Sequence, residues 1–209
     1  MRPFLAATTL LAGLAVAPLA AAAVVTSLPG GTVLARSGAD FIGVGPRTLA
    51  PGVTWSSTVP SSLFGYTGFA GSYSFNANGN WTAPPVFDAL NDFVGSMIYA
   101  FATPVAAVGG FLNYAPNFGP ASISIYDSSN APIESFTLSI STPGGANEGA
   151  FYGFSRETAS IAYFRVTGSY VALRDLTVPT AATETPEPAS LALLGAGLLG
   201  LAAARRRIA

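Results

Sequence analysis

The sequence predicts an all-β fold, a single β-sandwich or jelly-roll domain over residues 24–178 with an apolar segment on either side. Three observations support this prediction. The interior contains no long segment with the 3.6-residue periodicity of an amphipathic helix. Short runs there alternate apolar and polar residues, as in strands with one buried and one solvated face. Gly, Pro and Asn interrupt these runs at intervals of about ten residues, which is typical of sandwiches and jelly rolls.

The first 23 residues have the three regions of a secretory signal peptide. Arg2 supplies the positive charge, residues 4–17 form a charge-free apolar run, and residues 20–23 are all alanine. We expect the Sec translocon to export the chain and signal peptidase to cleave it after Ala23. The alternative is that this segment is kept as an N-terminal anchor.

The clearest strands of the domain form a hairpin in its second half. Residues 122–126 and 135–140 each alternate apolar with polar side chains, and the Asp-Ser-Ser-Asn string at 127–130 is typical of a turn. We therefore expect the two strands to pair antiparallel. Further strands are predicted at residues 31–36, 48–56, 73–76, 97–103, 105–114, 151–154, 161–167 and 170–178.

One short helix is predicted within the domain, over residues 83–96. The apolar residues that share its buried face at helical spacing are Phe87, Leu90 and Phe93. Asp88 and Asp92 are four residues apart and are expected to lie together on the solvated face.

A second apolar segment follows the domain. Residues 179–185 are small and polar and predict a flexible linker. Residues 189–204 carry no charge, and a helix of that length reaches roughly 24 Å, less than the roughly 30 Å of bilayer hydrocarbon. Arg205, Arg206 and Arg207 follow and are expected to stay on the cytoplasmic side as a stop-transfer anchor. The sequence thus predicts a short transmembrane helix that holds the chain transiently in the inner membrane.

Pro186, Glu187 and Pro188 directly precede this predicted helix. The prolines fix φ, remove two backbone donors and keep the preceding residues extended, a conformation that suits a protease groove. Together with the apolar helix and the arginine cluster, these residues resemble the PEP-CTERM protein-sorting signal of Gram-negative bacteria. The resemblance covers residues 186–209. It implies processing by an exosortase near Pro-Glu-Pro, loss of the helix, and delivery to the cell surface or an exopolysaccharide matrix.

The composition excludes several kinds of active site. The chain has no histidine, cysteine or lysine, and all nine of its basic residues are arginine. It therefore builds no Ser–His–Asp or Cys–His nucleophile, no His- or Cys-ligated zinc site and no lysine Schiff base. Residues 24–185 hold five arginines and nine acidic residues, a net charge of −4 that argues against nucleic acid as a partner.

Paired carboxylates are the remaining route to catalysis, as in glycoside hydrolysis. The candidates are Asp40, Asp88, Asp92, Asp127, Glu134, Glu148, Glu157 and Asp175. No two of them form a recognisable motif, so no catalytic residue is assigned and the chain is not expected to be an enzyme. Asp127 and Glu134 are interpreted as turn and edge-strand residues. Asp175, next to Arg174, is the one candidate ligand for calcium, which takes oxygen ligands, and no other cofactor is predicted.

Three functions remain open at this point. The first is an exported, non-enzymatic surface or extracellular-matrix protein, structural or adhesive, that exosortase sorts. The second is a secreted carbohydrate-binding or carbohydrate-active protein with the same tail, in which exposed Trp55, Trp81 and Tyr152 stack on sugar rings. The third is a permanently tail-anchored membrane protein. Since the chain is poor in charge, its 24 aromatic residues are also needed as core.

Overall fold

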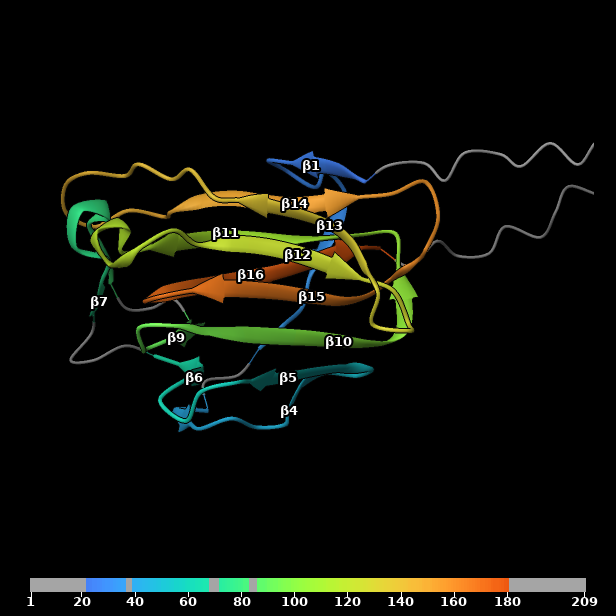
Figure 1. Ribbon diagram of the computed structural model, residues 1–209, viewed down its shortest axis with the longest axis horizontal. Coiled ribbons are helices and arrows are strands. Elements are labelled where there is room, and N and C mark those ends of the chain that lie inside the picture. The colour runs from blue at the N-terminus through green and yellow to red at the C-terminus, as the bar shows by residue number, and fades with distance from the viewer. Residues whose placement is uncertain (1–21, 37–38, 68–71, 83–85, 181–209) are drawn as a thin grey trace, which may run out of the picture.

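The computed structural model describes residues 22–36, 39–67, 72–82 and 86–180. This part of the chain is all-β, with two large antiparallel sheets and one small one, and it contains no α-helix (Figure 1). The predicted signal peptide up to Ala21, most of the linker and the C-terminal segment lie outside the described residues.

The larger sheet has eight strands, and all its neighbouring strands run antiparallel. In spatial order it contains β1 (Ala23–Val25), β14 (Ala150–Ser155), β11 (Ala107–Tyr114), β16 (Val171–Pro179), β9 (Phe87–Leu90), β6 (Leu63–Tyr66) and β3 (Phe41–Ile42), with β2 (Gly31–Val33) paired to the end of β16. The central strand β16 therefore has β11 on one side and both β9 and β2 on the other.

The second sheet has six strands. Its spatial order is β13 (Pro132–Thr137), β12 (Ser122–Tyr126), β15 (Ile161–Gly168), β10 (Gly95–Val105), β5 (Val53–Ser57) and β4 (Arg47–Ala50). The predicted hairpin is confirmed, because β12 pairs antiparallel with β13 from Ser122 opposite Thr137 to Ile125 opposite Glu134. The eight further predicted ranges each overlap a strand, and the range 48–56 divides into β4 and β5 at the Pro51–Gly52 turn.

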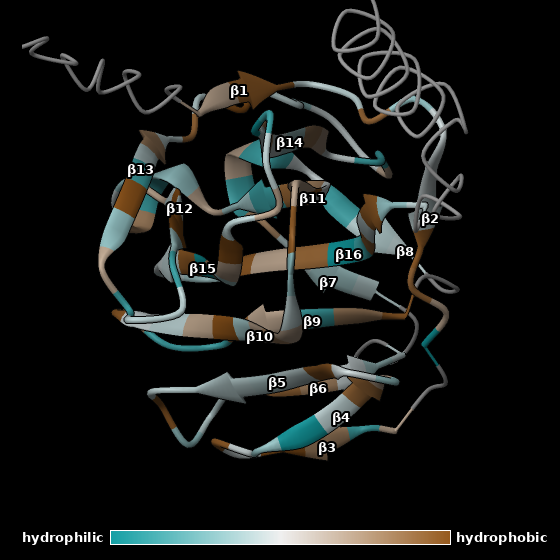
Figure 2. Cartoon of the chain, turned by 90° about the vertical axis from the view of Figure 1, so that its right-hand side faces the viewer, coloured by the Kyte–Doolittle hydropathy of each residue, from teal (hydrophilic) through white to brown (hydrophobic). Residues whose placement is uncertain are grey.

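The two large sheets pack face to face and enclose the main core, as in a β-sandwich. Figure 1 looks through both layers, and the colouring of Figure 2 shows apolar segments along the strands of each. Each sheet buries one face through the alternation of side chains along its strands, and strand β10 shows this most clearly. Its Met97, Tyr99 and Phe101 are buried, while the residues between them are partly solvated. Trp55 of one sheet meets Phe64 of the other with ring centroids 5.1 Å apart.

A second, smaller core lies on the outer face of the larger sheet. It is covered by a two-stranded ribbon of β7 (Ser72–Ser74) and β8 (Asn80–Thr82), which are joined by the 3₁₀ turn η1 (Asn76–Asn78). The cluster consists of Leu63, Tyr73, Phe75, Trp81, Phe87, Ala89 and Ala172. Strand β9 is consequently buried on both faces.

The helix predicted over residues 83–96 is wrong. Phe87–Leu90 form strand β9, Asp92 to Val94 form a loop, and Gly95 begins β10. All four residues of β9 are buried, because Asp88 and Leu90 face the main core while Phe87 and Ala89 face the smaller one. A strand buried on both faces shows no alternation of apolar and polar residues, so its sequence is open to a helical interpretation.

The described chain enters and leaves the sandwich at the same end. Ala23 lies opposite Ser155 at the end of β14, and β16 ends there as well, after Thr177 opposite Gly109. The loops after β9, β11 and β15 lie at the opposite end (Figure 1).

Candidate functional site

The residues of the predicted sorting signal continue from the end of β16. Thr180, the last described residue, is held against β2: its hydroxyl donates to the Gly30 carbonyl at 2.6 Å and lies 3.0 Å from the Thr32 hydroxyl. Five residues separate Thr180 from Pro186, and even fully extended they span no more than about 18 Å. Pro186, Glu187, Pro188 and the arginines at 205–207 lie outside the described residues.

The prediction of Trp55 and Trp81 as a sugar-stacking platform is corrected by the structure. Their exposed fractions are 0% and 1%, and they belong to the main and the smaller core respectively. Trp81 contacts Phe75 and Phe87 with ring centroids 4.9 and 5.9 Å away. The physical reason is that these are the two largest apolar side chains and each fills the centre of a core. Tyr152 is half-buried against Phe136, and its hydroxyl donates to the Ser139 carbonyl at 3.2 Å.

Asp175 lies in a bulge of β16 that turns its side chain to solvent. The register between β11 and β16 shifts there, and Asp175 has a φ of 52°, a left-handed conformation that aspartate tolerates better than most residues. Its carboxylate lies 3.6 Å from Arg174 Nε. Within the described residues no group of three or more acidic side chains is arranged to hold a metal. Calcium binding at Asp175 therefore stays a prediction.

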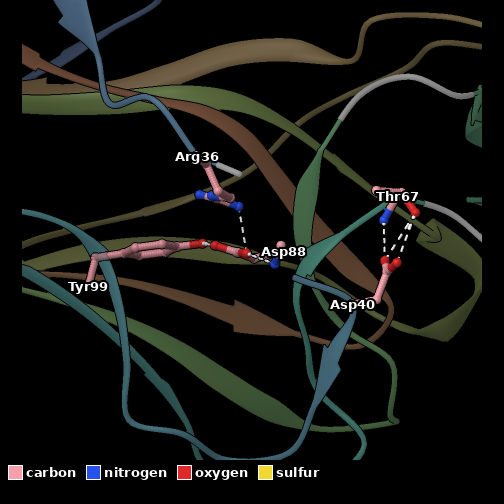
Figure 3. Close-up of polar contacts among 6 residues, drawn as sticks. Arg36, Asp40, Thr67, Asp88 and Tyr99 are labelled. Atoms are coloured by element: carbon pink, nitrogen blue, oxygen red, sulfur yellow. Dashed lines mark hydrogen bonds and ion pairs between the residues drawn. The ribbon is translucent and has the colours of Figure 1, made fainter. Parts of the chain in front are cut away.

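A deeply buried polar cluster, which the sequence did not predict, joins the two sheets. Asp88 is fully buried, and its Oδ1 accepts a hydrogen bond from the Gly65 N–H at 2.9 Å and lies 2.5 Å from Arg36 Nη1. Its Oδ2 accepts from the Tyr99 hydroxyl at 2.8 Å (Figure 3). Tyr99 comes from β10, so these contacts cross the main core. The sequence placed Asp88 on a solvated helix face, and that prediction is wrong.

Burial governs the protonation of this cluster. Desolvation raises the pKa of the Asp88 carboxyl, and the Arg36 guanidinium and the Gly65 and Tyr99 hydrogen bonds oppose that rise. Desolvation and the neighbouring Asp88 likewise raise the pKa of the Tyr99 phenol, which therefore stays protonated. Asp88 and Tyr99 are both 0% exposed, so a substrate has no access to either. The cluster acts as a link between the sheets.

Two other acidic residues, Asp40 and Asp127, order nearby loops. Asp40 accepts from the Thr67 N–H and hydroxyl at 2.8 and 3.0 Å, at the end of β6 (Figure 3). Asp127 accepts from the Ser129 hydroxyl at 2.6 Å within the predicted turn, so its interpretation as a turn residue is confirmed. Glu134 lies on β13, the edge of its sheet, also as expected.

Sequence reasoning also missed an exposed aromatic cluster at the loop end of the sandwich. Phe93 follows β9, Phe118 ends the 3₁₀ turn η2 (Pro116–Phe118) after β11, and Tyr170 precedes β16. The ring centroids of Phe118 and Tyr170 are 4.7 Å apart, and those of Phe93 lie 5.9 and 5.6 Å from them. Phe93 and Phe118 are 63% and 39% exposed. The only signal in the sequence is that three loops each carry one aromatic residue.

An open cavity of about 480 Å³ lies against two of these rings. It is lined by Ser72, Tyr73, Ser74, Asn76, Asn91, Ala115, Phe118 and Tyr170. None of these residues is acidic or basic. Burial, together with the neighbouring Tyr170, raises the pKa of the Tyr73 phenol, so that hydroxyl is neutral at physiological pH.

The comparisons with known proteins identify the segment that follows β16. Residues 184–207 match the family model of the PEP-CTERM protein-sorting motif. The chain therefore consists of an all-β domain followed in sequence by a sorting motif. The chain accordingly carries a PEP-CTERM protein-sorting motif, and this motif implies processing by exosortase, export and membrane-associated sorting. No curated protein and no solved structure matches the chain. Among the described residues there is no helix with the length and hydropathy to cross a membrane.

Proposed function

We propose that the protein is a non-enzymatic β-sandwich that exosortase delivers to the cell surface or the extracellular matrix, where it has a structural or adhesive role. The match of residues 184–207 to the sorting motif is the observation that carries this proposal. The fold is consistent with it, because two packed sheets give a stable exported domain without disulfides, which a chain lacking cysteine cannot form.

The roles of the carboxylates support the non-enzymatic part. Asp88 is enclosed between the sheets, and Asp40, Asp92 and Asp127 each accept hydrogen bonds from their own loops or from a neighbouring one. Carboxylates committed to such partners are poor general acids or bases, because a substrate would have to displace those partners first. Hydrolysis assays on polysaccharides, with each acidic residue neutralised in turn, test this. Turnover that one such variant abolishes would overturn it.

Fractionation and mass spectrometry test the sorting. In a host that carries exosortase, we expect an exported product that lacks the mass C-terminal to the Pro-Glu-Pro segment. Replacing Pro186, Glu187 and Pro188 by alanine should leave the uncut chain in the inner membrane, and Thr183→Ala, outside the matched residues, serves as the control. Deleting the exosortase should have the same effect as the triple substitution. A triple variant that is exported and cut like the parent chain contradicts the proposal.

The same mass spectrum reports the predicted signal-peptide cleavage. Cleavage after Ala23 leaves Val24 and Val25 of β1 to pair with Phe154 and Gly153. We expect a mature N-terminus at Val24. A product that still carries residues 1–23 would instead support the retained N-terminal anchor.

Carbohydrate binding is the second candidate function, and it no longer rests on Trp55 and Trp81. The exposed aromatic cluster of Phe93, Phe118 and Tyr170 beside the uncharged cavity favours it.

A further inference from the structure

We infer that the cavity at the loop end of the sandwich, lined by the rings of Phe118 and Tyr170 and flanked by the exposed ring of Phe93 packed against them, is a binding site for a neutral carbohydrate. This inference rests on the second candidate function, for which it names the site and the class of ligand, and it does not depend on sorting. Four elements meet at the site: the loop after β9, the turn η2, the β15–β16 turn and the β7–β8 ribbon.

The chemistry of the cavity lining matches that of a sugar. A sugar ring offers a C–H face that packs on aromatic rings and a rim of hydroxyls that need hydrogen-bond partners. The cavity supplies both, with the rings of Phe118 and Tyr170 beside the hydroxyls of Ser72 and Ser74 and the amides of Asn76 and Asn91. Asn91 already accepts a hydrogen bond from the Tyr73 hydroxyl at 3.3 Å, which fixes the orientation of that amide.

The absence of charged side chains from the described lining selects among ligand classes. An anionic ligand needs arginine or lysine, and a metal ion needs carboxylates. The described residues that line the cavity include neither. An apolar ligand needs an enclosed apolar pocket, whereas this cavity is open and bordered by amides and hydroxyls. A neutral polyhydroxylated ligand is the class that remains.

The backbone that carries the three aromatic residues is held in place before any ligand arrives. The Phe93 N–H donates to the Asp92 carboxylate at 2.7 Å, and the same carboxylate accepts from Ser61 at 2.8 Å. The Tyr170 N–H donates to the Asp92 carbonyl at 3.1 Å, which ties the β15–β16 turn to the loop after β9.

Main-chain hydrogen bonds also connect the β15–β16 turn to the loop that contains η2. The Tyr170 carbonyl accepts from the Ala115 N–H at 3.2 Å, and the Ala115 carbonyl accepts from the Phe118 N–H at 3.1 Å. Tyr170 itself has a φ of 45°, a left-handed conformation that a tyrosine rarely adopts. Exposed rings fixed by main-chain hydrogen bonds lose little conformational entropy on binding, which favours affinity for a weakly interacting ligand such as a sugar.

The position of the site also fits an external ligand. Tyr170 lies just before β16 and Thr180 just after it, and the nine residues of β16 span roughly 27 Å. The cavity, which Tyr170 lines, therefore lies at the end of the sandwich opposite to the point where the chain continues toward its sorting motif.

Binding to a microarray of neutral and acidic oligosaccharides, with the full chain purified in detergent, tests the inference. Affinity electrophoresis in gels containing a neutral β-glucan, xylan or galactomannan gives the affinities. We expect binding to at least one neutral glycan. Phe93→Ala and Phe118→Ala should each weaken it at least about tenfold, as expected for exposed aromatic anchors. Phe118→Tyr, which keeps the ring, should retain binding.

Two controls separate loss of the site from loss of the fold. Ile42→Ala removes a side chain that is 55% exposed on β3, away from the cavity, and should leave binding unchanged. Thermal melting of each variant should match that of the parent chain, because Phe93 and Phe118 are exposed. Absence of binding to every neutral glycan, a preference for acidic glycans, or full binding by the Phe93→Ala/Phe118→Ala double variant would each overturn the inference. So would dimerisation that Phe93→Ala abolishes, since it would assign this surface to a second copy. None of these outcomes bears on sorting.

Discussion

Asp88 is fully buried between the two sheets and has no access to water. Three partners compensate the cost of burying its carboxylate. Arg36 supplies the opposite charge, while the Gly65 N–H and the Tyr99 hydroxyl occupy the carboxylate oxygens. A buried ion pair of this kind adds little net stability relative to an apolar replacement of the whole group, but removing one partner leaves the other uncompensated. Single substitutions are therefore far more damaging here than at the surface.

We predict that Asp88→Ala lowers the free energy of unfolding by about 3–5 kcal/mol, because it leaves the Arg36 charge and the Tyr99 hydroxyl buried without their acceptor. Tyr99→Phe should cost about 1.5–3 kcal/mol, the usual contribution of a hydrogen bond to a charged group. Urea denaturation measures both. Glu134→Ala on the edge strand is the control and should stay within about 0.5 kcal/mol of the parent chain. A change of less than about 1 kcal/mol for Asp88→Ala would refute the role of the cluster as a link between the sheets.

The pH dependence of the same cluster can be tested through Arg36→Met. Burial raises the pKa of Asp88 and Arg36 opposes this, so the substitution should raise that pKa further. A carboxyl whose pKa is higher in the folded than in the unfolded chain stabilises the fold below its unfolded pKa. That contribution is lost as the pH rises through the folded pKa. We therefore expect the deficit of Arg36→Met relative to the parent chain to grow from pH 4 to pH 7 in urea titrations. An equal deficit at both values contradicts this reasoning.

The two tryptophans give a prediction that separates core from ligand surface. Trp55→Ala and Trp81→Ala should each cost about 3–5 kcal/mol in denaturant titrations, as for other large residues removed from cores. In the described structure neither indole nitrogen has a hydrogen-bond partner, so phenylalanine loses no hydrogen bond there. Because it keeps an aromatic ring and leaves a smaller cavity than alanine does, it should cost less than alanine. A parent-like stability for either alanine variant, with loss of glycan binding, would restore the sugar-platform interpretation.

At the scale of elements, the success of prediction depends on how many faces of a strand are buried. The hairpin of β12 and β13 belongs to the outer part of its sheet, and Ile123 and Ile125 are buried while Ser122 and Tyr126 are partly solvated. Alternation is then visible in the sequence. Strand β9 lies between two cores, so its apolar pattern is continuous and its aspartate has partners distant in sequence. A local sequence pattern does not predict partners that are distant in sequence, and for this reason the prediction of a solvated Asp88 is wrong.

For the candidate site as well, the sequence predicts what is contiguous and not what the fold brings together. The sorting motif is readable because its parts are contiguous, and the family match at residues 184–207 confirms it. The aromatic cluster draws Phe93, Phe118 and Tyr170 from three loops that only the strand order brings together. The sequence predicted that Trp55 and Trp81 stack on sugars, but a large aromatic side chain favours burial in a core as strongly as it favours stacking on a ligand.

The turn between β12 and β13 depends on the charge of Asp127. The Ser129 hydroxyl, followed by the Ala131 and Ser129 N–H groups, lowers the pKa of the Asp127 carboxyl. A lowered pKa means that this stabilisation is present at neutral pH and is lost as the pH falls through the folded pKa. We predict that hydrogen exchange of the Ser129 and Ala131 amides, followed by NMR and corrected for the intrinsic pH dependence of exchange, loses protection on acidification. In Asp127→Asn the protection should no longer depend on pH in this range. Parallel pH profiles for the two proteins would contradict this assignment.

For the molecule as a whole, the sandwich has two unlike ends. At one end the described chain begins at Ala22 and stops at Thr180, and at the other lie the exposed rings and the uncharged cavity. Only five residues of the linker lie between Thr180 and Pro186, and they span about 18 Å at full extension. So short a connection keeps the first end close to the membrane or enzyme that holds the sorting motif, and the length of β16, roughly 27 Å, keeps the cavity away from it.

The arrangement of the two ends predicts which end of the sandwich faces the bilayer while the chain is still uncut. The prediction assumes that residues 189–204 span the membrane, and it uses the triple substitution of the Pro-Glu-Pro segment to retain the chain there. Because the sequence has no cysteine, single cysteines can be labelled without background. Ser74→Cys marks the cavity end and Thr32→Cys the end where the chain leaves, and both side chains are exposed. In vesicles with a quencher on the lipid headgroups, we expect strong quenching of a fluorophore at position 32 and weak quenching at position 74. Equal quenching would mean that the sandwich lies flat on the membrane, and the cavity would then not be presented to an external glycan.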